Sequence, residues 1–89
     1  MIIILDNYLE GETKMILTKT LQHSTVKVVN FKNMNKLVRQ RLHDLGVVEG
    51  SIICLSKKLP FGGPCTIETK GQSIAIRRKE AMCIEVEPL

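Results

Sequence analysis

Residues 52–68 contain two β-rich runs, Ile52-Ile53-Cys54-Leu55 and Cys65-Thr66-Ile67-Glu68, and between them the connection Leu59-Pro60-Phe61-Gly62-Gly63-Pro64. An ordinary hairpin turn is polar and has about two to five residues. This connection instead combines two prolines, two glycines and a phenylalanine. Proline fixes φ and glycine permits a positive φ, so a loop of defined shape is expected. The stretch predicts two antiparallel strands with an apolar tip at Phe61.

Two interpretations of this loop stay open. Loops on rigid scaffolds often carry function, so the apolar tip is a candidate docking surface with Phe61 as its anchor. A small domain also needs every apolar side chain for its core, so Phe61 could fold back as a plug over one end of the domain. The first candidate partner-binding site is the whole loop: Leu59, Pro60, Phe61, Gly62, Gly63 and Pro64.

Strand patterns continue on both sides of this pair. β-branched residues and period-two alternation predict about five strands, at residues 25–31, 51–57, 65–69, 73–77 and 83–87. Residues 70–72 suit a tight turn and residues 78–81 suit a single 3₁₀ turn. Alternation places these side chains inward: Ile53, Leu55, Ile67, Ile74, Ile76, Ile84 and Val86. We therefore expect a mainly β fold, a small and strongly bent barrel whose closure removes exposed sheet edges.

One helix is expected between the first and second strands. Asn33 or Asn35 can cap its N-terminus, and Gly46 suits the position after its C-terminus, where a positive φ is favoured. Apolar residues recur at steps of three and four residues, which predicts one buried stripe: Met34, Leu37, Val38, Leu42 and Leu45.

Basic residues on this helix form the second candidate site. Arg39 and Arg41 are predicted to make a basic edge that meets an acidic patch on a partner, and Leu42 is grouped with them although it is expected in the core. A solvated charged face is the more ordinary interpretation, because most surface charges contribute little. The denser cluster Arg77-Arg78-Lys79 could contact nucleic acid phosphate or an acidic protein surface, or form a solvated turn.

Length and composition favour a binding module over an enzyme. The chain has 89 residues, enough for one domain but not for a packed core and a large substrate pocket. No nucleophile stands at motif spacing from a base, and no glycine-rich phosphate loop opens a helix. The net charge of +4 is too small to indicate nucleic acid binding alone, and aromatic residues make up only 3%.

Cysteine and histidine positions predict neither a metal site nor a cofactor. Cys54, Cys65 and Cys83 form no CxxC pair, and free cysteines suit a reducing cytosol. Cys54 and Cys65 could face each other across neighbouring strands and trap a soft ion, but buried apolar cysteines are more common. His23 and His43 have no partner at ligand spacing.

Residues 1–14 differ from the remainder because they are mostly acidic and apolar. We divide the chain into an N-terminal extension at 1–14 and a domain at 15–89. One hypothesis is that translation naturally starts at Met15, since codons for Glu10-Gly11-Glu12 can spell a ribosome-binding sequence. The other is a genuine extension whose apolar run pairs with a sheet edge.

Three segments in register resemble the FeoA family of bacterial ferrous iron transport proteins: residues 41–50, 59–64 and 74–81. The resemblance spans about Met15 to Val86 and implies an SH3-like barrel with one inserted helix. It further implies a cytoplasmic, non-catalytic accessory protein that binds the cytosolic, GTPase-containing portion of the transporter FeoB and supports Fe(II) uptake. The sequence departs from the family at His23-Ser24, where a glycine is frequent, and at Glu49, where a proline is frequent.

The expected function is therefore docking on FeoB, which biases the transporter between conformations by binding one of them better. No nucleic acid partner is expected, contact with the membrane is expected only through the transporter, and the oligomeric state is left open. Two alternatives remain. One is an SH3-like regulatory module akin to the C-terminal domain of iron-dependent repressors, and the other is a basic nucleic-acid-binding barrel.

Overall fold

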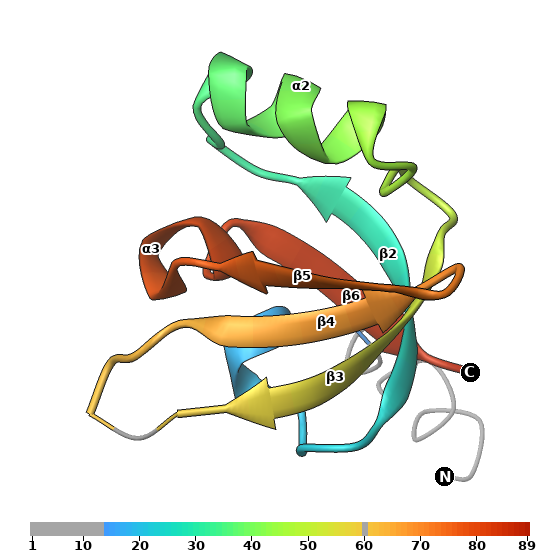
Figure 1. Cartoon of the computed structure of the whole chain (residues 1–89), viewed down its shortest axis with the longest axis vertical. Coiled ribbons are helices and arrows are strands. Elements are labelled where there is room, and N and C mark those ends of the chain that lie inside the picture. The colour runs from blue at the N-terminus through green and yellow to red at the C-terminus, as the bar shows by residue number, and fades with distance from the viewer. Residues whose placement is uncertain (1–13, 60) are drawn as a thin grey trace, which may run out of the picture.

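The computed structural model of the chain describes residues 14–59 and 61–89 (Figure 1). Its elements in chain order are β1 (Met15–Ile16), the 3₁₀ turn η1 (Leu17–Lys19), β2 (Thr25–Phe31), α2 (Lys36–Asp44), β3 (Ile52–Lys58), β4 (Cys65–Thr69), β5 (Gln72–Ile76), α3 (Arg78–Ala81) and β6 (Ile84–Pro88). Apart from Lys14, the predicted N-terminal extension lies outside the described residues, as does Pro60 in the predicted loop site.

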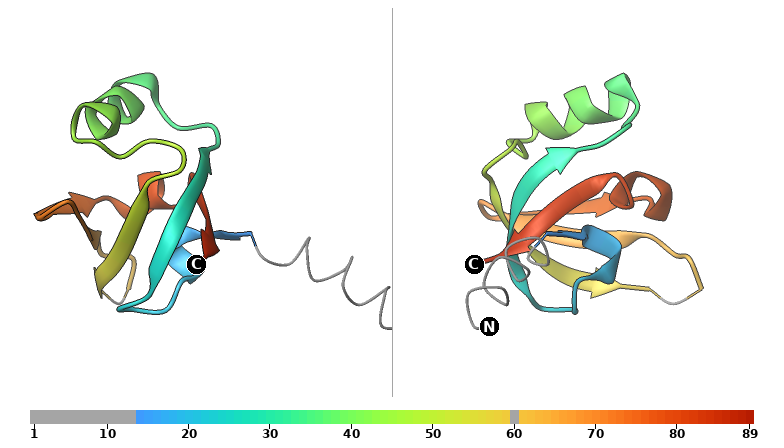
Figure 2. Two further views of the ribbon diagram at one scale, coloured as in Figure 1. Left: turned by 90° about the vertical axis from the view of Figure 1, so that its right-hand side faces the viewer. Right: turned by 180° about the vertical axis from the view of Figure 1, so that it is seen from behind.

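The strands form one antiparallel sheet in the order β1-β6-β2-β3-β4-β5, with α2 inserted between β2 and β3 (Figure 2). The prediction of a mainly β fold with one main helix is confirmed. The sheet is strongly curled, but the prediction of a closed barrel is wrong. In the part of the chain that the structure describes, β1 has two residues and β5 pairs with β4 alone, so these two strands lie at the edges of the sheet.

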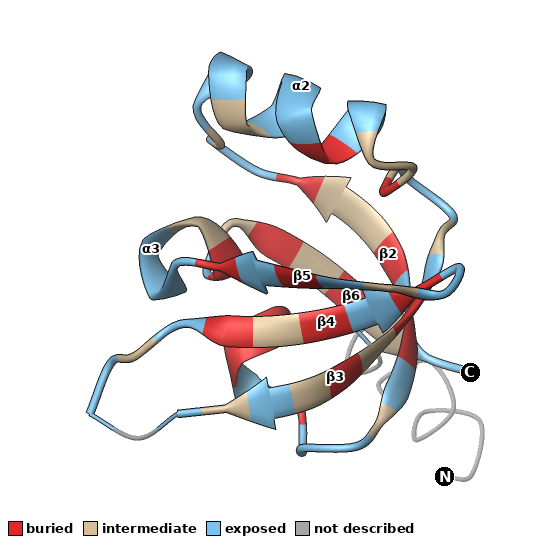
Figure 3. Cartoon of the chain, viewed as in Figure 1, coloured by how far each residue is buried: buried red, intermediate tan, exposed pale blue. Residues whose placement is uncertain are grey.

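The core lies inside the curled sheet, and buried residues recur along strands β2 to β6 (Figure 3). Every side chain predicted to face inward is buried: Ile53, Leu55, Ile67, Ile74, Ile76, Ile84 and Val86. Three buried residues that are not part of a strand complete the core: Leu17 of η1, Val47 and Ala81 of α3. Period-two alternation therefore positions the strands correctly, because a shift of one residue would expose the whole apolar face.

Both ends of α2 follow their local sequence. The Asn35 side-chain oxygen accepts hydrogen bonds from the backbone N–H of Leu37 (2.8 Å) and of Val38 (3.4 Å), and Gly46 has a φ of +90°. Leu42 is buried, but Leu37 is 78% exposed, so its predicted place in the buried stripe is wrong. Adjacent helical residues point about 100° apart, and Val38 takes the inward position beside Leu37.

α3 is a single α-helical turn, so the predicted 3₁₀ turn is wrong in type. The N–H groups of Ala81 and Met82 bond to the carbonyls of Arg77 and Arg78, four residues back in each case. Ala81 is fully buried, and this wider turn brings its small side chain against the core.

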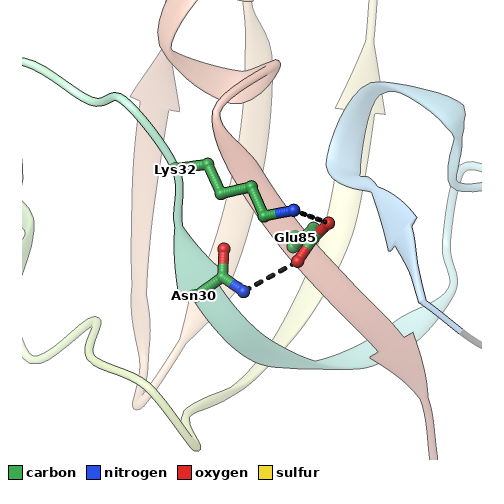
Figure 4. A network of polar contacts seen from close by, with 3 residues as sticks. All are labelled: Asn30, Lys32 and Glu85. Carbon is green, nitrogen blue, oxygen red and sulfur yellow. Dashed lines mark hydrogen bonds and ion pairs between the residues drawn. The ribbon is translucent and has the colours of Figure 1, made fainter.

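A polar network joins β2 to β6 where a bulge shifts their register (Figure 4). The Lys32 ammonium lies 3.0 Å from one oxygen of Glu85, and the Asn30 amide donates to the other at 2.7 Å. These hydrogen bonds, with that from Lys32 the stronger, lower the pKa of Glu85. The carboxylate therefore favours the native pairing of the two strands when it is ionised.

Candidate partner-docking surface

The connection between β3 and β4 projects from one end of the sheet (Figure 1). Phe61 at this tip is 103% exposed, and Leu59 is 40% exposed. The plug interpretation of Phe61 is therefore wrong. Lys58 and Cys65 form the last strand pair before the loop, so the chain beyond them extends past the end of the sheet with no core beneath it.

Glycine is required at the tip for two different reasons. Phe61 and Gly62 both have positive φ values, +59° and +81°, so the chain reverses through two left-handed residues. At Gly63 an added Cβ would lie only 2.8 Å from the Leu59 Cβ, so the leucine side chain packs directly on the glycine backbone. Phe61, Gly62 and Gly63 therefore have a backbone conformation that few other residues could adopt.

Basic side chains lie beside this apolar tip. β5 ends opposite the start of β4, with Ile76 paired to Cys65, so the cluster Arg77-Arg78-Lys79 begins at the same end of the sheet as the loop. The aliphatic part of Arg78 approaches Gly62, where an added Cβ would lie 3.6 Å from the arginine Cδ. All three basic residues are exposed, and none forms an ion pair with a residue in 14–59 or 61–89. Their contribution to the tip was not predicted, because it depends on the pairing of β4 with β5.

The helical candidate site does not form a single basic edge. The Arg39 guanidinium lies 5.6 Å from the centre of the Phe31 ring and 3.6 Å from the Glu49 carboxylate, on one side of α2. Arg41 lies on the other side, facing β5. Leu42 is only 4% exposed, so it belongs to the core and cannot offer a contact at the surface. Arg41 is the one residue of this set that keeps a free charged group for a partner within the described part of the chain.

The cysteines do not form the cross-strand pair considered above. Cys54 is paired with Glu68 and Cys65 with Lys58, at different positions along the β3–β4 ladder. Cys65 is buried, whereas Cys54 and Cys83 are partly exposed. Within residues 14–59 and 61–89, no three His, Cys, Asp or Glu side chains gather closely enough to hold a metal ion.

Neither helix found in these residues combines the length and apolar character needed to cross a membrane.

Comparison with known proteins agrees with this architecture. The FeoA domain family matches residues 15–88. This chain belongs to the FeoA family. The match covers the whole sheet and both helices, and it includes the projecting loop and the basic cluster beside it.

Solved FeoA structures share the fold. FeoA from Chlorobium tepidum is 31% identical over 84% of this chain and 70% of its own, with a TM-score of 0.78. A FeoA-like protein from Clostridium acetobutylicum is 32% identical over 86% of this chain and 88% of its own, with a TM-score of 0.71. FeoA from Stenotrophomonas maltophilia, solved with zinc and described as a prokaryotic SH3 domain protein, is 25% identical over 82% of this chain and 89% of its own, with a TM-score of 0.70. The curled sheet with its inserted helix is accordingly an SH3-like fold.

Part of a manganese-dependent transcriptional repressor has the same fold, at 14% identity over 85% of this chain and 42% of its own, with a TM-score of 0.77. IdeR from T. acidophilum is 21% identical over 85% of this chain and 34% of its own, with a TM-score of 0.74. At this identity the likeness concerns the fold alone. It agrees with the sequence-based comparison to SH3-like repressor domains and assigns no regulatory activity to this chain.

Proposed function

We propose that this FeoA-family protein is a non-catalytic accessory protein of ferrous iron uptake that docks on the cytosolic portion of a FeoB-type transporter. The proposed contact is the tip surface, defined as Leu59, Phe61, Gly62, Gly63, Pro64 and the neighbouring Arg78. It acts in the cytoplasm and reaches the membrane only through the transporter. The S. maltophilia relative has been put forward as a ferrous iron transport activating factor, which supports this placement.

The observation that carries the proposal is the complete exposure of Phe61 on a loop of defined shape. Burying an aromatic side chain of this size contributes about 1.5–3 kcal/mol, roughly ten- to a hundredfold in affinity. The positive φ values of Phe61 and Gly62 and the contact of Leu59 with Gly63 give these four residues a defined local conformation. Docking then costs little conformational entropy, so more of the burial energy appears as affinity.

Charge around the tip defines the partner surface that fits it. Arg77, Arg78 and Lys79 place positive charge next to the apolar anchor. A complementary surface has an apolar pocket with an acidic rim, and the rim charges act mainly on the rate of encounter and on specificity. Docking affects the GTPase cycle when the transporter conformations differ in affinity for the tip surface.

The proposal is tested by titrating the full chain with the soluble cytosolic portion of the transporter, nucleotide-free and with GDP or a non-hydrolysable GTP analogue. We expect saturable binding, with affinity that depends on the nucleotide state. Arg78→Glu should weaken binding and reduce its salt dependence, whereas Lys27→Glu, a charge reversal on β2, should not. Lack of binding in every nucleotide state would contradict the proposal.

The same experiment separates the two alternatives. A steep, salt-dependent affinity for RNA or DNA without binding to the transporter would favour a nucleic-acid-binding module. Selective capture of a separate DNA-binding chain would favour a module of the repressor type.

A further inference from the structure

An open cleft with a volume of about 730 Å³ lies between α2 on one side and β5 with α3 on the other. Its apolar wall is formed by Val38, Leu42 and Leu45 of the helical segment and by Ile74 and Ile76 of β5. A hydrogen bond of 2.6 Å from the Gln72 side-chain amide to the Leu45 carbonyl ties α2 to β5 at one end. The cleft therefore has a fixed width at that end and opens towards α3.

The floor of the cleft is a free sheet edge. Among the strands of residues 14–59 and 61–89, β5 pairs only with β4, through a two-residue turn in which Lys70 and Gly71 have φ values of +51° and +81°. In such a hairpin the flanking pair, here Thr69 and Gln72, is hydrogen-bonded, and hydrogen-bonded pairs alternate along the ladder. The backbone groups of Ser73 and Ala75 therefore point away from β4, and Ala75 lines the cleft.

Side-chain alternation along β5 sets the chemistry of each face. Ile74 and Ile76 point inward and are buried, whereas Ser73, Ala75 and the following Arg77 point outward and are exposed. A strand added to this edge would place alternate side chains against the isoleucines and the others beside Arg77.

The charges that line the cleft are mostly positive. Arg41, Arg77 and Lys79 contribute three cations and Glu80 one carboxylate. None of the three cations is in an ion pair with any residue of 14–59 or 61–89. An occupant with negative charge complements this rim, and a basic occupant is repelled by it.

We propose that this cleft binds an extended, acidic segment of a partner protein as an additional strand on β5. The segment alternates apolar residues, which pack on the partly buried Val38 and Leu45 beside β5, with acidic residues, which face Arg77 and Arg41. β5 spans five residues, so the paired part of the segment is about five residues long, roughly 17 Å. Backbone hydrogen bonds to Ser73 and Ala75 supply affinity, and the alternating side chains supply specificity.

The proposal is independent of docking through the tip surface and is tested with a labelled heptapeptide in which valine alternates with glutamate. Fluorescence anisotropy should show saturable binding to the full chain. Peptides of the same composition with all valines preceding the glutamates, or with lysine in place of glutamate, should bind at least about tenfold more weakly. Arg41→Glu, a charge reversal on the helix side of the cleft and apart from the tip surface, should weaken binding about fivefold, and Lys27→Glu should leave it unchanged.

Strand addition has a specific signature that an unstructured apolar contact lacks. Alternate N–H groups of the peptide face β5, so N-methylation of one alternate set should abolish binding while the other set is tolerated. Amide hydrogen exchange at Ser73 and Ala75 should slow by about tenfold or more when the peptide binds. Equal affinity of both methylated peptides, or unchanged exchange at these amides, would overturn the proposal.

Other occupants of the edge give different results. Protection of Ser73 and Ala75 before any peptide is added, together with a dimer in sedimentation, would assign the edge to a second copy of this chain. Protection that disappears when residues 1–14 are removed would assign it to the chain's own N-terminal segment. Either result would overturn a partner segment as the occupant.

Discussion

The two hairpins that share β4 are connected in very different ways. β4 and β5 are joined by Lys70 and Gly71 alone, the shortest common connection between antiparallel strands. β3 and β4 are joined by residues 59–64, whose apolar tip is fully exposed at Phe61. The first connection only reverses the chain between its two strands. The second exposes a large apolar side chain that the core does not use, and this difference is the basis on which we propose the tip surface as a docking site.

The difference also separates stability from binding in this domain. Residues of β4 and of the short turn determine whether the sheet forms, because they are buried or have a backbone conformation that few residues adopt. Leu59, Phe61, Pro64 and Arg78 of the tip surface are exposed, so their side chains can change with little effect on folding, whereas Gly62 and Gly63 are required by the local backbone. Substitutions in the two hairpins should therefore give opposite patterns of stability and affinity.

The largest effect on stability is expected for Ile67→Ala in the strand that both hairpins share. Ile67 is fully buried, and its truncation leaves a cavity in the centre of the core. We expect a loss of about 2–5 kcal/mol in the free energy of unfolding, measured by denaturant titration. A loss below about 1 kcal/mol would show that the core repacks around β4. It would contradict the claim that buried residues of β4 determine stability while exposed residues of the tip surface do not.

A smaller loss is expected for Gly71→Ala in the short turn. No atom lies within 4 Å of the added Cβ, so the cost comes only from the φ of +81°, which alanine disfavours. We expect about 1 kcal/mol of destabilisation. Lys70→Gly is the matched control, since it relieves the neighbouring positive φ and should leave stability unchanged or higher. Equal effects of the two substitutions would contradict this account of the turn.

The paired strands β2 and β6 lie outside both hairpins. Their polar contacts add a smaller, pH-dependent contribution to the free energy of unfolding. The pKa of Glu85 is lowered in the folded protein, first by its hydrogen bond with Lys32. Its contribution to stability is present above the ordinary glutamate pKa of about 4.3 and is lost as the pH falls through the lower folded value. Glu85→Gln should flatten the acid side of the stability–pH profile, and an unchanged slope would exclude this role.

The strands and most of the core were predictable because their signals are local. Alternation of apolar and polar residues correctly predicted which side chains of β3 to β6 point inward. Asn35 and Gly46 indicated where the helix begins and ends. Leu37 was wrongly assigned to the buried stripe. Apolar residues spaced three and four positions apart cover a wide arc of the helix surface, and only the part of that arc that contains Val38 and Leu42 packs against the core. Barrel closure was wrongly expected because alternation along a strand does not indicate which strands pair with it, and among the described residues β5 pairs with β4 alone.

The candidate site was predictable only in part. The unusual composition of residues 59–64 indicated a candidate site in this loop. Composition alone did not decide whether Phe61 is an exposed anchor for a partner or a plug over the core. The approach of Arg78 to Gly62 and the separation of Arg39 from Arg41 depend on strand pairing and helix rotation. These are tertiary properties, and the sequence defines them only after the register of the sheet is known.

Phe61→Ala gives the most direct test that an exposed tip serves binding and not folding. The same sample is measured by thermal unfolding and by titration with the cytosolic portion of the transporter, beside Leu89→Ala, an exposed apolar control at the opposite end of the molecule. We expect the affinity to fall about tenfold or more for Phe61→Ala alone, with the unfolding temperature of both variants unchanged. Unchanged affinity, or a large loss of thermal stability in Phe61→Ala, would contradict the account.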